Sequence, residues 1–301
     1  MDIRWLRTFV TAAELENFRH TAERLYIAQP TVTVHIRRLE NEIGTRFFRR
    51  SGRNIVLTEA GRRFLPHAKQ ILSHHDSGLH DLLSWRQGYK KKLILAVSPL
   101  IAGSILPYII QRFTGQHQDT EVIVQVAESK DIGEMIEKKT ADIGLSRMKP
   151  VHLSLTADTL YEDPIMCVAP HDGGDFETSP PLDIDELFEQ QILFTHNHPG
   201  FWDDLLADIR MSHYPPRTMV VSQVHITKRF IEEGLGFSFL PKSSIRRELM
   251  EGRLLKVETK KLHLPVAATY IVTRHPTEEA QKFIVFLREY YKKPLRRERL
   301  I

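Results

Sequence analysis

Apolar residues recur at helical spacing in three stretches near the start of the chain, and this pattern predicts three short helices. Asn17 is a suitable N-cap for the second helix, and Pro30 suits the first turn of the third, where its missing N–H has no partner anyway. The third helix repeats the apolar positions Val32, Ile36, Leu39 and Ile43. Two helices joined by a tight turn, the second with hydroxyl, imidazole and guanidinium groups on its outer side, predict a helix-turn-helix. An ordinary amphipathic helical hairpin is the alternative, and the basic outer side argues against it.

A short hairpin is predicted directly after these helices. Phe47-Phe48 and the run from Ile55 to Leu57 are strand-like, and the residues between them, 49–54, include three arginines, Gly52 and Asn54. Two strands with such a tip form a β-hairpin. Its basic tip would suit a phosphate backbone.

The segment AERLYIAQPTVTVHIRRLENEIGTRFFRR, followed by LTEAG, resembles the N-terminal winged helix-turn-helix of the LysR-type transcriptional regulators. In that family a Gln-Pro opens the recognition helix, a Leu-Glu ends it, and Thr-x-x-Gly opens a linker helix. The resemblance is close over roughly the first 65 residues. This chain departs from the family at Ala28, where Ser or Thr is usual, and at Val34, where a polar or basic residue is common.

This resemblance and the basic outer side of the third helix predict a protein–DNA interface. Contacts to base edges are expected from the polar side chains at the start of the recognition helix, namely Gln29, Thr31, Thr33 and His35, with Pro30 opening that helix. Contacts to phosphates are expected from the guanidinium groups of Arg37, Arg38, Arg50 and Arg53.

Charge is distributed unevenly along the chain. Residues 1–92 hold 17 Lys and Arg against 9 Asp and Glu, a net charge of +8, whereas the remainder holds 25 against 29, a net charge of −4. A polyanionic partner is therefore expected for the first part alone. The 301 residues suggest about two domains, and the single cysteine, Cys167, excludes an internal disulfide framework and suits a cytoplasmic protein.

Residues 58–89 predict one long helix, with Pro66 tolerated in its opening turns. Two series at seven-residue spacing contain the leucines Leu65, Leu72, Leu79 and Leu82, which predicts that the helix pairs with a second copy of itself. A helix lying on its own domain is the alternative.

Residues 93–111 carry no charge and approach the length of a membrane span. Pro99, Gly103 and Pro107 interrupt this segment. A buried strand, a turn and a helix account for it better than a span does.

The part of the chain after residue 91 alternates strand-like and helical runs, which predicts an α/β body with largely parallel sheets. It resembles the effector-binding domain of LysR-type regulators, which is similar to the two-lobed periplasmic binding proteins. The resemblance implies a DNA-binding domain (1–58), a linker and dimerisation helix (59–90) and an effector domain (91–301). The effector domain would have lobe I at 91–162 and 267–301 and lobe II at 163–266, with crossovers near Pro164 and Pro265.

No catalytic residues are predicted, because the chain lacks a Gly-x-Ser-x-Gly elbow, a His-Glu-x-x-His motif, a Walker loop and a cysteine pair. No cofactor is expected. The adjacent His74 and His75 would point apart on a helix, and His196 and His198 alternate on an extended run, so no metal site is predicted either.

Binding at strand ends is the remaining expectation, because ligands of doubly wound sheets lie there. The residues expected to line an effector cleft are Ser98, Pro99, Ser129, Arg147, Thr195, His196, His198 and His225. These strand ends bring a guanidinium, imidazoles and hydroxyls but no carboxylate, so the expected effector is a small carboxylate anion.

The sequence thus predicts a DNA-binding transcription regulator controlled by a small molecule and paired into dimers, or tetramers by analogy with the family. Two other classes of protein are the alternatives. A solute-binding or enzymatic α/β domain with an incidental helical segment would need an export signal or catalytic residues. An architectural DNA binder would leave the large second part without a purpose.

Overall fold

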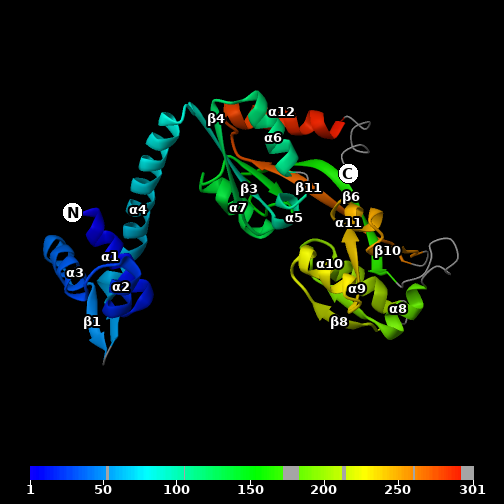
Figure 1. Cartoon of the computed structure of the whole chain (residues 1–301), viewed down its shortest axis with the longest axis horizontal. Coiled ribbons are helices and arrows are strands. Elements are labelled where there is room, and N and C mark those ends of the chain that lie inside the picture. Colours follow the sequence, from blue (N-terminus) through cyan, green and yellow to red (C-terminus); the bar gives the residue numbers. More distant parts are fainter. Residues whose placement is uncertain (52–53, 105, 172–182, 212–214, 260–261, 293–301) are drawn as a thin grey trace. The chain divides into compact units, whose positions relative to one another are not determined.

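The computed structural model describes residues 1–51, 54–104, 106–171, 183–211, 215–259 and 262–292. The chain divides into two compact units, Met1–Gly88 and Tyr89–Ile301, called here the N-terminal and C-terminal units (Figure 1).

The N-terminal unit is a three-helix core with a hairpin and a long helix. Its elements are α1 (Ile3–Leu15), α2 (Phe18–Leu25), α3 (Gln29–Ile43), β1 (Phe48–Ser51), β2 (Asn54–Leu57) and α4 (Glu59–Arg86). As predicted, the Asn17 side chain caps α2 by accepting from the N–H groups of Arg19 and His20. Aromatic rings fill the centre: Phe47 stacks on Phe64 at 4.8 Å, and Phe9 lies 5.0 Å from Phe47. Helices and hairpin therefore share one core.

A buried carboxylate joins α3 to the hairpin. Glu40 accepts hydrogen bonds from the backbone N–H groups of Phe47 (2.7 Å) and Phe48 (3.2 Å), and Arg46 pairs with its other oxygen at 3.3 Å. These interactions give the Glu of the Leu-Glu motif a structural role, because they satisfy backbone donors where β1 begins.

The long helix α4 starts at a capped and closely packed turn. Thr58 accepts from the N–H of Gly61 through its hydroxyl, and a Cβ at Gly61 would lie 2.4 Å from the carbonyl oxygen of Phe47. Glycine therefore lets α4 approach the hairpin. The helix continues through Pro66 to Arg86, close to the predicted range.

The C-terminal unit has strands and helices in alternation. Its elements are β3 (Lys91–Val97), α5 (Pro99–Ala102), α6 (Leu106–Gln116), β4 (Thr120–Val126), α7 (Ser129–Glu137), β5 (Ile143–Ser146), β6 (Thr156–Pro170), α8 (Ile184–Gln190), β7 (Ile192–Thr195), α9 (Trp202–Met211), β8 (Arg217–Val220), α10 (Val224–Glu232), β9 (Gly236–Pro241), α11 (Lys242–Met250), β10 (Leu254–Val257), β11 (Val266–Thr273) and α12 (Glu278–Lys292).

The long strand β6 connects two lobes. Its first half, up to Pro164, pairs with β11, and the sheet continues through β5 and β3 to β4; this part is lobe I. From Ile165 onward β6 pairs with β9 and β10, and the sheet continues through β7 to β8; this part is lobe II. Strands β6 and β11 thus lie side by side where the lobes join, in the region where the sequence predicts the crossovers (Figure 1). The domain and lobe boundaries themselves stay predictions.

The sheets are more mixed than the sequence suggests. Pairings of β3 with β4 and β5, and of β7 with β8 and β9, are parallel, whereas β6, β10 and β11 pair in antiparallel fashion. Gly236 marks one close approach, since a Cβ there would lie 2.1 Å from the carbonyl oxygen of Ile192 on the neighbouring strand.

The uncharged segment 93–111 is part of the core of lobe I. It forms most of β3, all of α5 and the first half of α6, and Leu93, Leu95 and Val97 are fully buried. In the described ranges, no helix has the length and apolar character that crossing a membrane requires.

Removing the Glu40 carboxylate should destabilise the N-terminal unit. We expect Glu40→Ala to cost about 2–4 kcal/mol, because two backbone N–H groups near the core lose their acceptor. Glu40→Gln keeps an acceptor and should cost less. The measurement is urea unfolding of the full chain followed by circular dichroism. Glu42→Ala, which removes an exposed carboxylate from the same helix, is the control. Equal effects of Glu40→Ala and Glu42→Ala would contradict the proposed anchoring.

Candidate functional site

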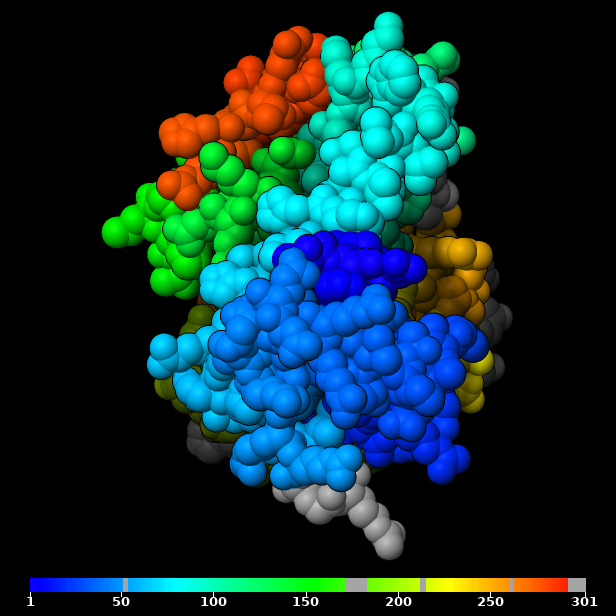
Figure 2. Space-filling view, turned by 90° about the vertical axis from the view of Figure 1, so that its left-hand side faces the viewer, coloured from blue at the N-terminus to red at the C-terminus, as the bar shows by residue number. Residues whose placement is uncertain are grey.

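Helix α3 presents a polar surface on the N-terminal unit. Its buried side carries Val32, Ile36 and Leu39, so the opposite side faces outward. Of the predicted contact residues, the exposed ones on this helix are Gln29, Pro30, Arg37 and Arg38, and the partly exposed ones are Thr31 and Thr33. Figure 2 looks onto the N-terminal unit from the α3 side, where the blue surface of residues 29–43 occupies the middle. The outward side of α3 therefore presents several of the predicted contact residues, whereas the Arg38 guanidinium lies over the ring of Trp5 on α1, 5.7 Å from its centroid.

His35 lies differently from the expectation. Its Nδ1 is 2.9 Å from the hydroxyl of Thr8 on α1, and its ring is partly buried. Burial, and the positive charges of Arg4 and Arg38, lower the pKa of His35, so the ring is neutral near pH 7. Its neighbour Val34 is exposed instead. The structure therefore turns His35 toward α1 rather than outward.

The predicted phosphate contacts on the hairpin are partly described. Arg50 lies on β1 and is exposed. Arg53, at the tip, lies outside the described residues.

Helix α4 has two different halves. Leu65 and Leu72 pack against the core of the N-terminal unit, together with Phe64 and the fully buried Ala68. The sequence places both leucines on a pairing face, but the structure uses them to complete the three-helix core. Further along, Leu79 and Leu82 are 52% and 60% exposed, and Leu83 and Trp85 are exposed beside them. Only the C-terminal half of α4 thus carries a cluster of large exposed apolar side chains.

A cavity of about 1070 Å³ lies within the C-terminal unit. Its lining includes seven of the eight residues predicted for the effector cleft: Ser98, Pro99, Ser129, Arg147, His196, His198 and His225. They come from both lobes, at the ends of β3, β5 and β7 and at the starts of α5, α7 and α10.

Thr195 is the exception and does not line this cavity. It is the last residue of β7, and its buried hydroxyl lies 3.5 Å from the carbonyl oxygen of Met219 on β8. The same hydroxyl lies 2.9 Å from Nδ1 of His196, the exposed residue after β7, whose backbone is left-handed (φ 60°) and which lines the cavity wall.

Two helix N-termini face the cavity. Neither α7 nor α10 has a side-chain hydrogen bond at its N-cap, so backbone N–H groups and the positive end of each helix dipole remain available there. The two N-cap residues, Glu128 of lobe I and Gln223 of lobe II, meet at 3.2 Å. This exposed hydrogen bond joins the two lobes at the cavity.

The hydroxyl of Ser98, another residue of the cavity lining, is buried. It is 3% exposed and has no hydrogen-bond partner in the described part of the chain. A buried hydroxyl without a partner is unfavourable, so Ser98 can be satisfied by a molecule that enters the cavity.

Arg147 is fully engaged by the protein. Its Nη2 pairs with Asp163 at 3.2 Å, its Nη1 donates to the hydroxyl of Thr269 at 2.7 Å, and its Nε lies 3.2 Å from Nε2 of His198. Asp163 in turn accepts from the backbone N–H (3.0 Å) and the hydroxyl (2.5 Å) of Ser243, the second residue of α11. We call the buried residues Arg147, Asp163, Thr269 and His198, together with the exposed Ser243, the polar cluster.

His198 is an uncharged member of this cluster. Burial, together with the charge of Arg147, lowers its pKa to about 3. The Gly200 N–H approaches Nδ1 at 3.1 Å, while Arg147 approaches Nε2. A neutral imidazole has one acceptor nitrogen, so it accepts from one of these two donors at a time. His198 therefore offers no positive charge to an anion.

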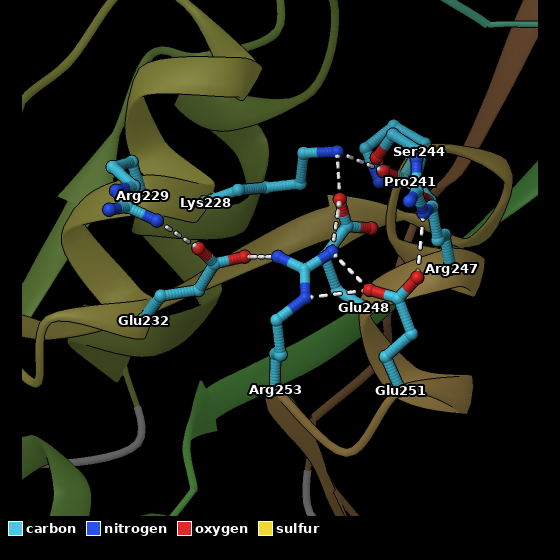
Figure 3. Close-up of polar contacts among 9 residues, drawn as sticks. All are labelled: Lys228, Arg229, Glu232, Pro241, Ser244, Arg247, Glu248, Glu251 and Arg253. Carbon is cyan, nitrogen blue, oxygen red and sulfur yellow. Dashed lines mark hydrogen bonds and ion pairs between the residues drawn. The ribbon is translucent and has the colours of Figure 1, made fainter.

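The cavity also contains carboxylates, contrary to the expectation from the strand ends. Glu128, Glu162, Asp163 and Glu248 all line it. Glu248 belongs to a network on the lobe II wall (Figure 3), in which Lys228 of α10 donates to Glu248 at 2.6 Å and to the carbonyl oxygen of Ser244 at 2.9 Å. Arg253 bonds Glu232 of α10 and Glu251 of the α11 C-cap. Charged side chains thus fix α10 against α11.

Lys242, the first residue of α11, differs from the other cations on the wall. It is exposed, lines the cavity, and forms no hydrogen bond or ion pair with the described residues. Sequence reasoning missed Lys242 as well as Asp163, Thr269 and Ser243, because no motif or spacing marks them. Within the described ranges, no three His, Cys, Asp or Glu side chains are grouped so as to hold a metal ion.

Comparison with known proteins gives the family. Residues 3–62 match the model of the bacterial regulatory helix-turn-helix proteins of the lysR family, and residues 86–292 match the LysR substrate binding domain. The chain is 47% identical to the HTH-type transcriptional regulator CitR of Bacillus subtilis, over 97% of this chain and 100% of CitR. It is 39% identical to the uncharacterized regulator YxjO of the same organism, over 96% and 98%.

A crystal structure of full-length CbnR in complex with its target DNA has the same fold, with a TM-score of 0.70 at 19% identity, over 97% of this chain and 99% of CbnR. The two family models cover both units, and the named relatives match over nearly their whole lengths. This chain belongs to the LysR family of transcriptional regulators, with a DNA-binding helix-turn-helix and a domain that binds a small molecule.

Proposed function

We propose that this regulator binds a small carboxylate in the cavity of its C-terminal unit, and that this binding controls how a pair of N-terminal units holds specific DNA. It would act in the cytoplasm and without catalytic activity of its own, in line with relatives that are named as regulators.

The Ser98 hydroxyl is the observation that carries the effector proposal. A ligand oxygen beside it would accept this unused hydrogen bond and would also face the uncapped N-termini of α7 and α10. Ser129 begins α7, and His225 lies in the first turn of α10. Lys242 adds a charge that has no counter-ion among the described residues. Such an environment favours an anion over a cation.

The division of roles on the DNA follows from exposure for the described residues and, for Arg53, from the sequence alone. We assign base contacts to Gln29, Thr31 and Thr33, and phosphate contacts to Arg37, Arg38, Arg50 and Arg53. His35 is left out of the base contacts, because it bonds Thr8. The solved complex of the similarly folded CbnR with its target DNA supports DNA binding by this type of structure.

Pairing is assigned to the exposed half of α4. Leu79, Leu82, Leu83 and Trp85 form an apolar surface that a second α4 would cover. Two linked N-terminal units then bind two half-sites with increased overall affinity. A further pairing into tetramers rests on family analogy alone.

The effector prediction is that Ser98→Ala weakens carboxylate binding about tenfold, because one hydrogen bond is lost, while the folded state is no less stable. Isothermal titration calorimetry against organic acids, amino acids and neutral aromatic compounds measures binding, and thermal unfolding measures stability. Ser104→Ala is the matched control, since Ser104 also lines the cavity but already donates to Ile101. Binding only of neutral or cationic compounds would refute the carboxylate assignment.

The DNA prediction separates Arg50 from Gln29. Arg50→Ala should weaken binding to all sequences alike and reduce the slope of log affinity against log salt by about one, as the loss of one phosphate contact implies. Gln29→Ala should cost about 1–3 kcal/mol on the cognate site and little on random DNA. Fluorescence anisotropy with the promoter region beside the protein's own gene, at several salt concentrations, measures both. The assignment fails if the two variants behave alike.

The assembly prediction concerns the exposed leucines. Leu79→Asp with Leu82→Asp should give monomers with intact N-terminal units and greatly reduced site affinity, because charges cannot be buried in an apolar interface. Light scattering measures the mass. Ser77→Asp adds a charge to the same exposed helix and serves as the control. An unchanged mass of the double variant would place the interface elsewhere.

A further inference from the structure

Every nitrogen of the Arg147 guanidinium already donates to a protein side chain. Its three nitrogens donate to His198, Thr269 and Asp163 respectively, and a carboxylate gripped at two points needs two neighbouring nitrogens. A two-point grip by a ligand therefore competes with the protein side chains that these nitrogens already bind. Among the described partners of Arg147, only Asp163 carries a charge.

Asp163 also has a second set of donors that does not depend on Arg147. The backbone N–H and the hydroxyl of Ser243 hold its two oxygens at the start of α11, where the helix dipole favours negative charge. The Asp163 carboxylate can therefore lose Arg147 and still keep two hydrogen bonds.

We propose that Asp163 is a built-in competitor of the effector, because its carboxylate occupies the Arg147 guanidinium that an effector carboxylate would bind. Asp163 then sets the affinity of the cavity for anions. This inference rests on the proposed function, since it requires a carboxylate effector.

The replacement of Asp163 by an effector carboxylate at Arg147 changes the net charge around the guanidinium, and this change has a measurable consequence. The Arg147–Asp163 pair is neutral and almost fully buried, with side-chain exposures of 1% and 4%. A second carboxylate would leave one net negative charge in this cluster, and a buried uncompensated charge takes up a proton instead. Anion binding should therefore be accompanied by proton uptake and should strengthen as the pH falls.

The groups around Asp163 limit where the proton can go. Arg147 at the end of β5 is already protonated, whereas Tyr161 of β6, Thr269 of β11 and Ser243 of α11 are uncharged hydroxyl groups. Glu162, which precedes Asp163 in the chain, and Lys242, which precedes Ser243, are exposed and line the cavity. Besides Asp163, these groups offer two other proton acceptors, the Glu162 carboxylate and the neutral imidazole of His198.

The test on the unaltered full chain is calorimetry with propionate, succinate and tricarballylate in two buffers of different ionisation enthalpy at equal pH. Proton uptake appears as a binding enthalpy that differs between the buffers. Repeating the titrations between pH 6 and 8 should show affinity rising as the pH falls.

Asp163→Asn removes the competitor and keeps the shape. Its affinity for the best-binding carboxylate should rise at least about tenfold, and its proton uptake should disappear. Because this variant leaves the charge of Arg147 buried and unpaired, it should also be less stable, and added carboxylate should raise its unfolding temperature more than that of the unaltered chain. Thermal unfolding remains informative even if the variant is only marginally stable.

Two control variants identify the group that takes up the proton. Glu162→Gln removes a carboxylate from the adjacent cavity wall and should leave proton uptake in place. His198→Gln keeps an acceptor for Arg147 and should also leave uptake in place; loss of uptake there would assign the proton to His198 and overturn the proposal.

Carboxylate binding without proton uptake, and with equal affinity in Asp163→Asn, would overturn the inference while leaving the proposed function intact. Failure of every carboxylate to bind both proteins would instead refute the effector class, and the inference with it. Binding to Asp163→Asn alone would support the competition.

Discussion

The ion pair between Arg147 and Asp163 is the interaction on which the C-terminal unit depends. It joins the end of β5 to the crossover strand β6, while Thr269 adds β11 and Ser243 adds α11. Both lobes and both crossovers therefore meet at one buried guanidinium. Removing one partner of such a pair costs about 3–5 kcal/mol, because the other charge is left buried. A single substitution of Arg147 would thus disturb the fold as well as any ligand contact.

The two halves of α4 show why a heptad pattern alone does not identify its partner. The same seven-residue spacing includes Leu72, which completes the core of the N-terminal unit, and Leu79, which that core does not reach. Apolar residues at regular spacing predict that one side of a helix is buried. Which partner buries that side depends on the elements that lie next to the helix. The partner of the apolar side changes along α4, because the three-helix core contacts only the first half of this helix.

The fold could largely be predicted where a local signal existed. Runs such as Leu93–Val97 identify buried strands, whereas the first half of β6 contains polar residues from Thr156 to Glu162 that no alternation distinguishes from a loop. Helix α11 carries little local signal, because Ser243, Ser244 and Arg246 resemble a turn. At the cavity, strand ends predicted the correct region, but not that Thr195 turns away. Asp163 could not be predicted as a cluster member, because it meets Ser243 across 80 residues of chain.

The cavity combines two kinds of positive potential with different consequences. Side-chain cations on its wall mostly have carboxylate partners, as Arg147 has Asp163 and Lys228 has Glu248, so they add little net charge. The uncapped starts of α7 and α10 carry fixed partial charges of the backbone, which need no counter-ion. An anion that has to displace Asp163 from Arg147, or that is held by helix ends and hydroxyls, is bound less tightly than one held by a free guanidinium in a buried site. Weaker, reversible binding suits a sensor, whose occupancy has to change with the concentration of its ligand. The internal carboxylates therefore fit a regulatory cleft better than a cleft evolved for tight capture.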